Sequence, residues 1–304
     1  MSGTAVAGAH SHAPDVFARR ARRRVVLFIV LVALLFASAI ASIMMGQYSL
    51  PMSRVPEVLF NGPSAQGIDA SVVWNIRLPR IVLGLLVGAA LGVAGALMQA
   101  VFANPLAEPS VIGVNSGAGV GAAIAIVFEW KFLGASTVAF AAFITAVLTT
   151  AVVYQLARYQ GRVHVVNLIL TGIAINAVCG AAISFMLYLA PTTNREQIIF
   201  WQMGSLNGSQ WKHVWVVLPI VAAGLLFSLT LGSKLDTLAL GDKAARHLGI
   251  NVPALRLAAI GASTLLTAGA GAYAGLIGFV GLIIPHLLRG ITGPSNKVLL
   301  PACA

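Results

Sequence analysis

Charged residues are scarce in this sequence of 304 residues, where Asp, Glu, Lys and Arg together make up only 9%. Soluble domains carry about 25% of these residues, so the scarcity excludes an ordinary soluble domain. Hydrophobic residues account for 59% of the chain, and the mean hydropathy is +0.92. The composition therefore predicts an integral membrane protein.

Acidic residues are the scarcest charged class, with 8 Asp and Glu against 19 Lys and Arg. No apolar run contains a clear pair of carboxylates, and Glu108 and Glu129 lie at the edges of loops. A carrier driven by a proton or ion gradient usually has an acid or a base within the membrane. The lack of such a residue argues against a carrier of that kind.

Cysteines are few, and catalytic motifs are absent from the sequence. The two cysteines, Cys179 and Cys303, make a disulfide framework unlikely. There is no nucleophile elbow, metal-ligand cluster or phosphate-binding loop, so no catalytic residue, metal site or cofactor is predicted in this chain. The net charge of +11 would suit a nucleic-acid partner, but the basic residues lie in short loops that orient membrane proteins. No nucleic-acid partner is predicted.

The apolar residues gather in long runs. A helix needs about 20 apolar residues to cross the hydrocarbon core of a bilayer. Five arginines precede the first run, so residues 1–24 are predicted to be a disordered basic N-terminus and residues 25–304 a transmembrane domain. The third and eighth runs are short and Gly-rich, which indicates partial or irregular spans. The eight runs cover residues 25–45, 81–102, 111–128, 132–157, 165–190, 214–231, 254–273 and 275–288.

The distribution of Lys and Arg predicts the orientation. If the N-terminus is cytoplasmic, 13 of these residues fall on the cytoplasmic side and 6 on the other. Positive residues are enriched in cytoplasmic loops, so the N-terminus is predicted to be cytoplasmic. Two runs also carry small residues at every fourth position, which predicts close helix packing: Gly84, Gly88, Gly92, Ala96, Ala100 and Gly113, Gly117, Gly121, Ala125.

The stretch "LGDKAARHLGI", Leu240–Ile250, is unusual because it is charged and lies between two apolar runs. Asp242 suits the N-cap of a short helix that starts at Lys243, and Gly249 suits the left-handed position after its end. Ala244, Ala245 and Leu248 would share one small apolar face. The pattern predicts a capped amphipathic helix, with a solvated loop helix as the plainer alternative.

Four stretches in order carry a family resemblance: "RLPR" (77–80), "NPLAEP" (104–109), "LGDKAARHLG" (240–249) and "GFVGLIIPH" (278–286). They resemble the membrane-spanning subunits of type II ATP-binding-cassette importers for iron chelates, haem and cobalamin. The resemblance implies an all-α fold of ten membrane helices, in the bacterial inner membrane. This chain ends at "NKVLLPACA", where family members enter their ninth helix, so the last two helices are expected to be missing.

The resemblance also implies partners. Family members form homodimers, with two nucleotide-binding subunits that bind ATP and Mg, and a periplasmic solute-binding protein docks on the outer side. The capped helix, in a cytoplasmic loop at about residues 232–253, would be the coupling helix that inserts into the ATPase subunit. The implied coupling residues are Leu240, Gly241, Asp242, Ala244, Ala245, Arg246, Leu248 and Gly249.

Further site residues follow from the same resemblance. Arg77 and Arg80 would dock the binding protein, or they would anchor a helix end at the membrane surface; Arg80 is expected to lie deeper. Asn104, Pro105 and Leu106 match the loop that narrows the pathway. Val165 and Val166 match a second gate, with ordinary packing as the alternative. Arg195 lies near the outer entrance, where a cation would attract haem propionates or an acidic siderophore.

Three classes of function remain in competition. The first is the importer permease, with haem as the leading substrate and a ferric siderophore or cobalamin as alternatives. The second is a secondary carrier or channel that works alone, and the third is a membrane enzyme or structural bundle. The capped helix favours the first over the second, because a lone carrier has no ATPase to receive it.

Overall fold

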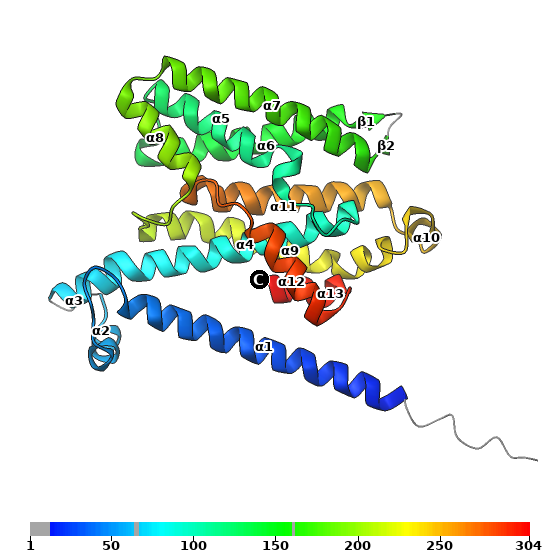
Figure 1. Ribbon diagram of the computed structural model, residues 1–304, viewed down its shortest axis with the longest axis horizontal. Coiled ribbons are helices and arrows are strands. Elements are labelled where there is room, and N and C mark those ends of the chain that lie inside the picture. Colours follow the sequence, from blue (N-terminus) through cyan, green and yellow to red (C-terminus); the bar gives the residue numbers. More distant parts are fainter. Residues whose placement is uncertain (1–12, 64–66, 160–161) are drawn as a thin grey trace, which may run out of the picture. The chain divides into compact units, whose positions relative to one another are not determined.

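The computed structural model describes residues 13–63, 67–159 and 162–304 (Figure 1). The chain forms two compact units, Met1–Ala65 and Gln66–Ala304. Each unit is built almost entirely of helices, as the long apolar runs predict. The described part of the chain has one two-stranded sheet, the antiparallel hairpin of β1 (Arg158–Tyr159) and β2 (Arg162–Val163).

The first unit consists of α1 (Ala13–Met44), the 3-10 turn η1 (Met52–Arg54) and α2 (Val55–Phe60). Within α1, residues Arg22–Met44 are long and apolar enough to cross a membrane. The prediction of disorder for residues 1–24 is wrong for 13–24, because the helix already begins at Ala13. Residues 1–12 lie outside the described residues. The basic residues of this segment continue the apolar helix instead of breaking it, since Arg is a good helix former.

The second unit carries the remaining helices, and its long helices alternate in direction along the chain (Figure 1). In chain order they are α3 (Ile68–Ser71), η2 (Val72–Arg77), α4 (Leu78–Phe102), η3 (Pro109–Ile112), α5 (Val114–Val127), η4 (Gly134–Ser136), α6 (Thr137–Leu156), α7 (Val165–Leu189), α8 (Thr192–Met203), α9 (Trp211–Leu238), α10 (Asp242–His247), α11 (Val252–Ala274), α12 (Val280–Thr292) and α13 (Asn296–Cys303).

The predicted membrane segments are confirmed. Within the described residues, 6 helices are long and apolar enough to span a membrane, and two shorter apolar helices accompany them. The shorter two, α5 and α12, are the third and eighth predicted runs, which were expected to be partial spans. Both are bounded by residues with positive φ, Gly113 before α5 and Phe279 before α12, and these break the chain direction.

The core of the second unit is centred on α4 and α11. In each, 61% of the residues in the most apolar stretch of 18 are buried. Close helix approach depends on glycines. A Cβ on Gly95 of α4 would lie 1.7 Å from the carbonyl oxygen of Gly281 in α12. A Cβ on Gly117 or Gly121 of α5 would lie 2.3 or 2.1 Å from a threonine hydroxyl of α6. These contacts require glycine, because any side chain would separate the backbones.

The two small-residue stripes have different outcomes. The stripe on α5 packs against α6, as predicted. The stripe on α4 is not one continuous contact: a Cβ on Gly92 would lie 2.6 Å from the carbonyl oxygen of Cys303, whereas the space beside Gly88 is open. The closest approach of α4 is made by Gly95, which lies outside the predicted stripe, because α12 crosses α4 on a different face.

Candidate functional site

The short helix α10 is held by backbone geometry at its C-terminal end. Gly249 has φ of 82°. Its N–H donates to the carbonyl of Arg246 at 3.0 Å, and the N–H of Ile250 donates to the carbonyl of Ala245 at 3.0 Å. These two bonds form a Schellman motif, which satisfies carbonyls that a helix end otherwise leaves unpaired. The prediction that Gly249 takes the left-handed position after the end of the helix is therefore confirmed.

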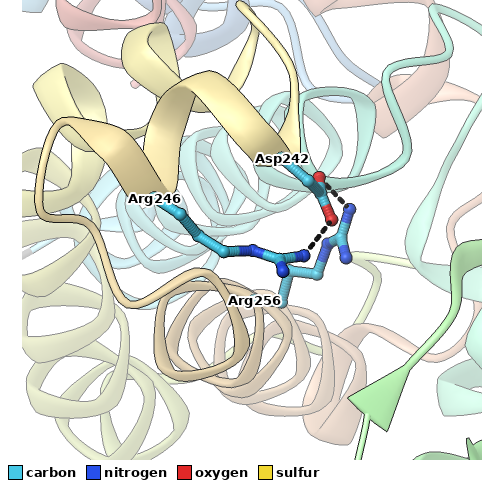
Figure 2. A network of polar contacts seen from close by, with 3 residues as sticks. All are labelled: Asp242, Arg246 and Arg256. Atoms are coloured by element: carbon cyan, nitrogen blue, oxygen red, sulfur yellow. Dashed lines mark hydrogen bonds and ion pairs between the residues drawn. The ribbon is translucent and has the colours of Figure 1, made fainter.

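The N-terminal end of α10 differs from the prediction. The N-cap is Gly241, with φ of 100°, and Asp242 is the first residue of the helix. The carboxylate of Asp242 accepts from Nη2 of Arg256 at 2.9 Å and lies 3.7 Å from Nη2 of Arg246 (Figure 2). The expectation that Asp242 caps its own helix is wrong, because the two arginines hold its carboxylate. An acid in the first turn still favours the helix dipole.

Arg256 is a residue whose role the sequence did not reveal. It lies in the first turns of α11, and only 13% of its side chain is exposed. The Arg256–Asp242 ion pair therefore joins α10 to α11 at a point that is mostly shielded from water. Because the two residues are 14 positions apart and on different helices, no helical periodicity relates them. The sequence identified Arg256 only as one of the charges in a loop.

The apolar residues around α10 do not form the predicted face. Ala245 is fully buried, with 0% of its surface exposed, and points into the second unit. Leu240 and Leu248 are instead 68% and 65% exposed, and Ala244 is half-buried. The connection is also shorter than the predicted 232–253, since α9 continues to Leu238 and α11 begins at Val252. What α10 offers to a partner is therefore a pair of leucines that flank a charged helix.

The two predicted docking arginines lie at the start of α4, with their exposure opposite to expectation. Arg77, at the end of the π-helical segment η2, is only 8% exposed. Arg80, one turn further along, is exposed. The expectation that Arg80 lies deeper is wrong, because the π-helical segment directs Arg77 toward the protein. Arg80 is thus the arginine that a partner can reach at this end.

The predicted gate residues lie after the C-terminal end of α4 and at the N-terminal end of α7. Asn104, Pro105 and Leu106 form an exposed turn after α4, in which Oδ1 of Asn104 accepts from the N–H of Leu106 at 2.9 Å. Val165 and Val166 begin α7, where Val166 is 64% exposed. The turn and Val166 are therefore available to a partner surface, whereas Val165 is half-buried.

Arg195 has a structural task. It lies on α8, where its Nε donates to the carbonyl of Leu187 at 3.0 Å and its Nη2 donates to the carbonyl of Ala190 at 3.2 Å. Both carbonyls belong to the C-terminal end of α7, where a cation stabilises the helix dipole. The guanidinium thus caps a helix, and it is less free to attract a solute than the sequence suggested.

Polar side chains inside the spans also join helices. Nε2 of Gln99 donates to the carbonyl of Leu282 at 3.2 Å, and Nδ2 of Asn176 donates to the carbonyl of Ser110 at 3.0 Å. Within the described residues, no group of three or more His, Cys, Asp or Glu could hold a metal ion. Gln99 and Asn176 therefore stabilise contacts between segments that are far apart in sequence.

The predicted site residues divide between the two ends of the second unit. The turn after α4, the start of α7 and α10 lie at one end, and the start of α4 and α8 lie at the other (Figure 1). This arrangement of apolar spans, with a charged helix fixed at one end, defines a polytopic membrane permease. The FecCD transport family matches residues 32–304, and the chain belongs to this family.

Similar proteins are named as permeases for cobalamin and hemin. The chain is 40% identical over 234 residues to a cobalamin import system permease, BtuC, of Halobacterium salinarum, covering 77% of this chain and 62% of that protein. It is 37% identical over 236 residues to the hemin transport system permease HmuU of Yersinia pestis, covering 76% of this chain and 70% of that one. It thus spans less than two thirds of the archaeal relative.

The fold is also found in a solved structure. An inward-facing conformation of a metal-chelate type ABC transporter aligns with a TM-score of 0.79 at 32% identity, covering 91% of this chain and 85% of that one. The predicted fold class, that of type II importer permeases, is therefore confirmed.

Proposed function

We propose that this chain is the permease subunit of an ATP-driven importer that passes a bulky iron-containing solute, with haem as the leading candidate, into the cytoplasm. Its partners are a second copy of the chain, two nucleotide-binding subunits that bind ATP and Mg, and a periplasmic solute-binding protein. The hydrolysis of ATP belongs to the partner subunits. The chain itself supplies the pathway and the surfaces on which its partners dock.

The observation that carries the proposal is the geometry of α10. A short helix is fixed at both ends, by the Schellman motif at Gly249 and by the Asp242–Arg256 ion pair, and it exposes Leu240 and Leu248. Rigid presentation of apolar residues reduces the entropy that a partner must offset on binding. A solvated loop would need neither the fixed ends nor the exposed leucines. The ATPase subunit is the partner that such a coupling helix would meet.

The end of the second unit that carries α10 is assigned to the cytoplasm. The excess of Lys and Arg on the N-terminal side, 13 against 6, supports this orientation. It places the turn Asn104–Leu106 and the start of α7 at the cytoplasmic mouth, in the bacterial inner membrane. The start of α4, with Arg80, then faces the periplasm, where the binding protein docks.

The pathway is proposed to lie between two copies. In α7, only 17% of the residues in the most apolar stretch of 18 are buried, whereas the value for α4 is 61%. Val166, Leu170 and Ile173 lie on one face of α7 and are each about 60% exposed, so this face is free to pair. The glycine contacts close the interior of one copy, which leaves little room for a wide pore inside it.

The substrate assignment rests on the relatives. One relative is named for cobalamin and another for hemin, with identities of 40% and 37%, so the identities do not separate the two solutes. Haem remains our leading candidate, with cobalamin and a ferric siderophore as the alternatives. All three are large, and a dimer axis that opens and closes would accommodate any of them.

The test is uptake into proteoliposomes that contain the complete importer with ATP enclosed. Haem, cobalamin and a ferric siderophore compete for uptake, each with its binding protein. We expect uptake of one solute that requires ATP and the ATPase subunit, with haem the strongest competitor. Uptake that follows an ion gradient without the ATPase subunit would support the lone carrier and refute the importer.

A further inference from the structure

We propose that the groove between α6 and α11 is a binding site for one anionic phospholipid. The groove has a volume of about 650 Å³, within the usual range for sites that hold a small molecule. It lies between the C-terminal end of α6 and the N-terminal end of α11. The proposal depends on the membrane-spanning character of these helices and not on the proposed transport function.

The two walls of the groove are regular helix faces. On α6 the lining runs from Val147 through Ala151 to Tyr154, and on α11 it runs from Ala254 through Leu257 to Gly261. These spacings of three and four residues keep each set on one face of its helix. Leu257 is 51% exposed and Val147 37%, so the apolar floor is open to the surroundings. An acyl chain is the occupant that a bilayer supplies to such a floor.

The charged and amide side chains lie at one end of the groove only, and the two threonines of its deeper part, Thr150 and Thr264, donate their hydroxyls to carbonyls of their own helices. Arg158, Gln155 and Asn251 line it where α6 ends and α11 begins, whereas Val147, Ile260 and Leu265 line its deeper part. A phospholipid has the same polarity along its length, with a phosphate at the interface and acyl chains below. Tyr154, also in the lining, fits this level because tyrosines favour the membrane interface.

The charge of the groove selects an anionic head group. Arg158 is exposed, and its guanidinium donates to the neutral Oε1 of Gln155 at 3.4 Å. Among the described residues that line the groove, none is acidic, so no carboxylate offsets this charge. The N-terminal end of α11, a helix of 23 residues, adds a positive dipole end at the same level. Basic pockets between membrane helices bind anionic lipid head groups in this way.

Substitutions at Gly261 and Arg158 test separately the part of the groove that would hold the acyl chains and the part that would hold the head group. Gly261→Phe fills the groove without a clash, because a Cβ at Gly261 meets nothing within 4 Å. Gly271→Phe is its matched control, since Gly271 is on the same helix, has equally open space and does not line the groove. Arg158→Gln removes the charge, Arg158→Lys keeps it, and Lys234→Gln removes a charge outside the groove.

The measurement is native mass spectrometry of the full chain, delipidated in mild detergent and titrated with phosphatidylglycerol or phosphatidylcholine. We expect one phosphatidylglycerol to bind more tightly than phosphatidylcholine. Arg158→Gln should weaken phosphatidylglycerol about fivefold, Gly261→Phe should abolish binding of both lipids, and Arg158→Lys and the two controls should bind normally. Equal binding by the wild type, Arg158→Gln and Gly261→Phe would overturn the proposal.

A second measurement uses the wild-type chain, so it remains informative if a variant fails to fold. It also tests whether the groove is filled by a second copy of the chain and not by lipid. A photoactivatable phosphatidylglycerol is incorporated with the wild-type chain and its adducts are mapped. Adducts on Leu257 and Val147 would support the site. Adducts elsewhere, or a Gly261→Phe variant that loses its self-association while it keeps its lipid, would show that a second copy fills the groove and would refute the lipid site.

Discussion

At the scale of single residues, burial decides which of the arginines predicted from the sequence a partner can reach. Arg77 and Arg80 come from the same short motif, yet Arg77 is 8% exposed and Arg80 is exposed. Arg195 and Arg256 also have specific partners, a helix end and Asp242. A motif predicts that an arginine is present at a membrane interface, whereas packing decides which of them a partner can reach.

Arg80→Glu should therefore weaken docking of the periplasmic binding protein. A charge at the rim of an interface acts mainly on the rate of association, so the loss should appear as slower binding that fades at high salt. We expect a decrease of about tenfold in the association rate at low salt, measured by surface-immobilised importer and soluble binding protein. Arg80→Lys is the control and should bind almost normally. An unchanged rate at low salt would leave Arg80 as a membrane anchor only.

At the scale of elements, α10 was largely predictable from its sequence. Its position, its polarity and its end at Gly249 follow from a charged stretch bounded by glycines. The N-cap and the apolar face were not predictable, because Asp242 pairs with Arg256 of α11 and Ala245 packs against the second unit. Both errors arise from tertiary contacts, which override local helix preferences. The same applies to Gly95, whose partner Gly281 is far away in sequence.

The exposed leucines of α10 give a test of coupling. Leu248→Asp should decrease ATP-driven transport at least about tenfold while the protein stays folded, because an unpaired charge buried in the ATPase groove costs several kcal/mol. Leu248→Met keeps an apolar side chain of similar size and should transport almost normally. Transport and ATP hydrolysis are measured in the same proteoliposomes. Normal coupling in Leu248→Asp would refute the role of α10 as a coupling helix.

A substitution at Ala245 should have a different effect. Because Ala245 is 0% exposed, Ala245→Asp would bury an unpaired charge within the chain itself. We expect loss of folded protein in detergent, measured by size-exclusion chromatography and thermal unfolding, with a cost of about 3 kcal/mol or more. A stable Ala245→Asp protein that fails only in transport would mean that Ala245, and not Leu248, meets the ATPase.

At the scale of the whole molecule, the number and places of the membrane helices were predictable, since length and hydropathy decide them. The surface proposed to lie between two copies is harder to predict from the sequence, because length and hydropathy do not identify it. We propose that α7 contributes to this surface, because only 17% of the residues in its most apolar stretch are buried within one copy. Val166, 64% exposed at the start of α7, lies where the proposed cytoplasmic gate would close.

The central claim is that the chain is an importer permease whose pathway lies between two copies. A cross-link between the two copies at this gate tests that claim most directly. Val166→Cys is introduced into a background with Cys179→Ala and Cys303→Ala, in the complete importer in membranes. Leu156→Cys, 63% exposed at the end of α6, is the matched control. We predict that Val166→Cys forms a disulfide with its counterpart in the second copy, that its yield changes with ATP, and that Leu156→Cys forms none. Equal yields at the two positions, or no cross-link at Val166→Cys in any nucleotide state, would contradict the account.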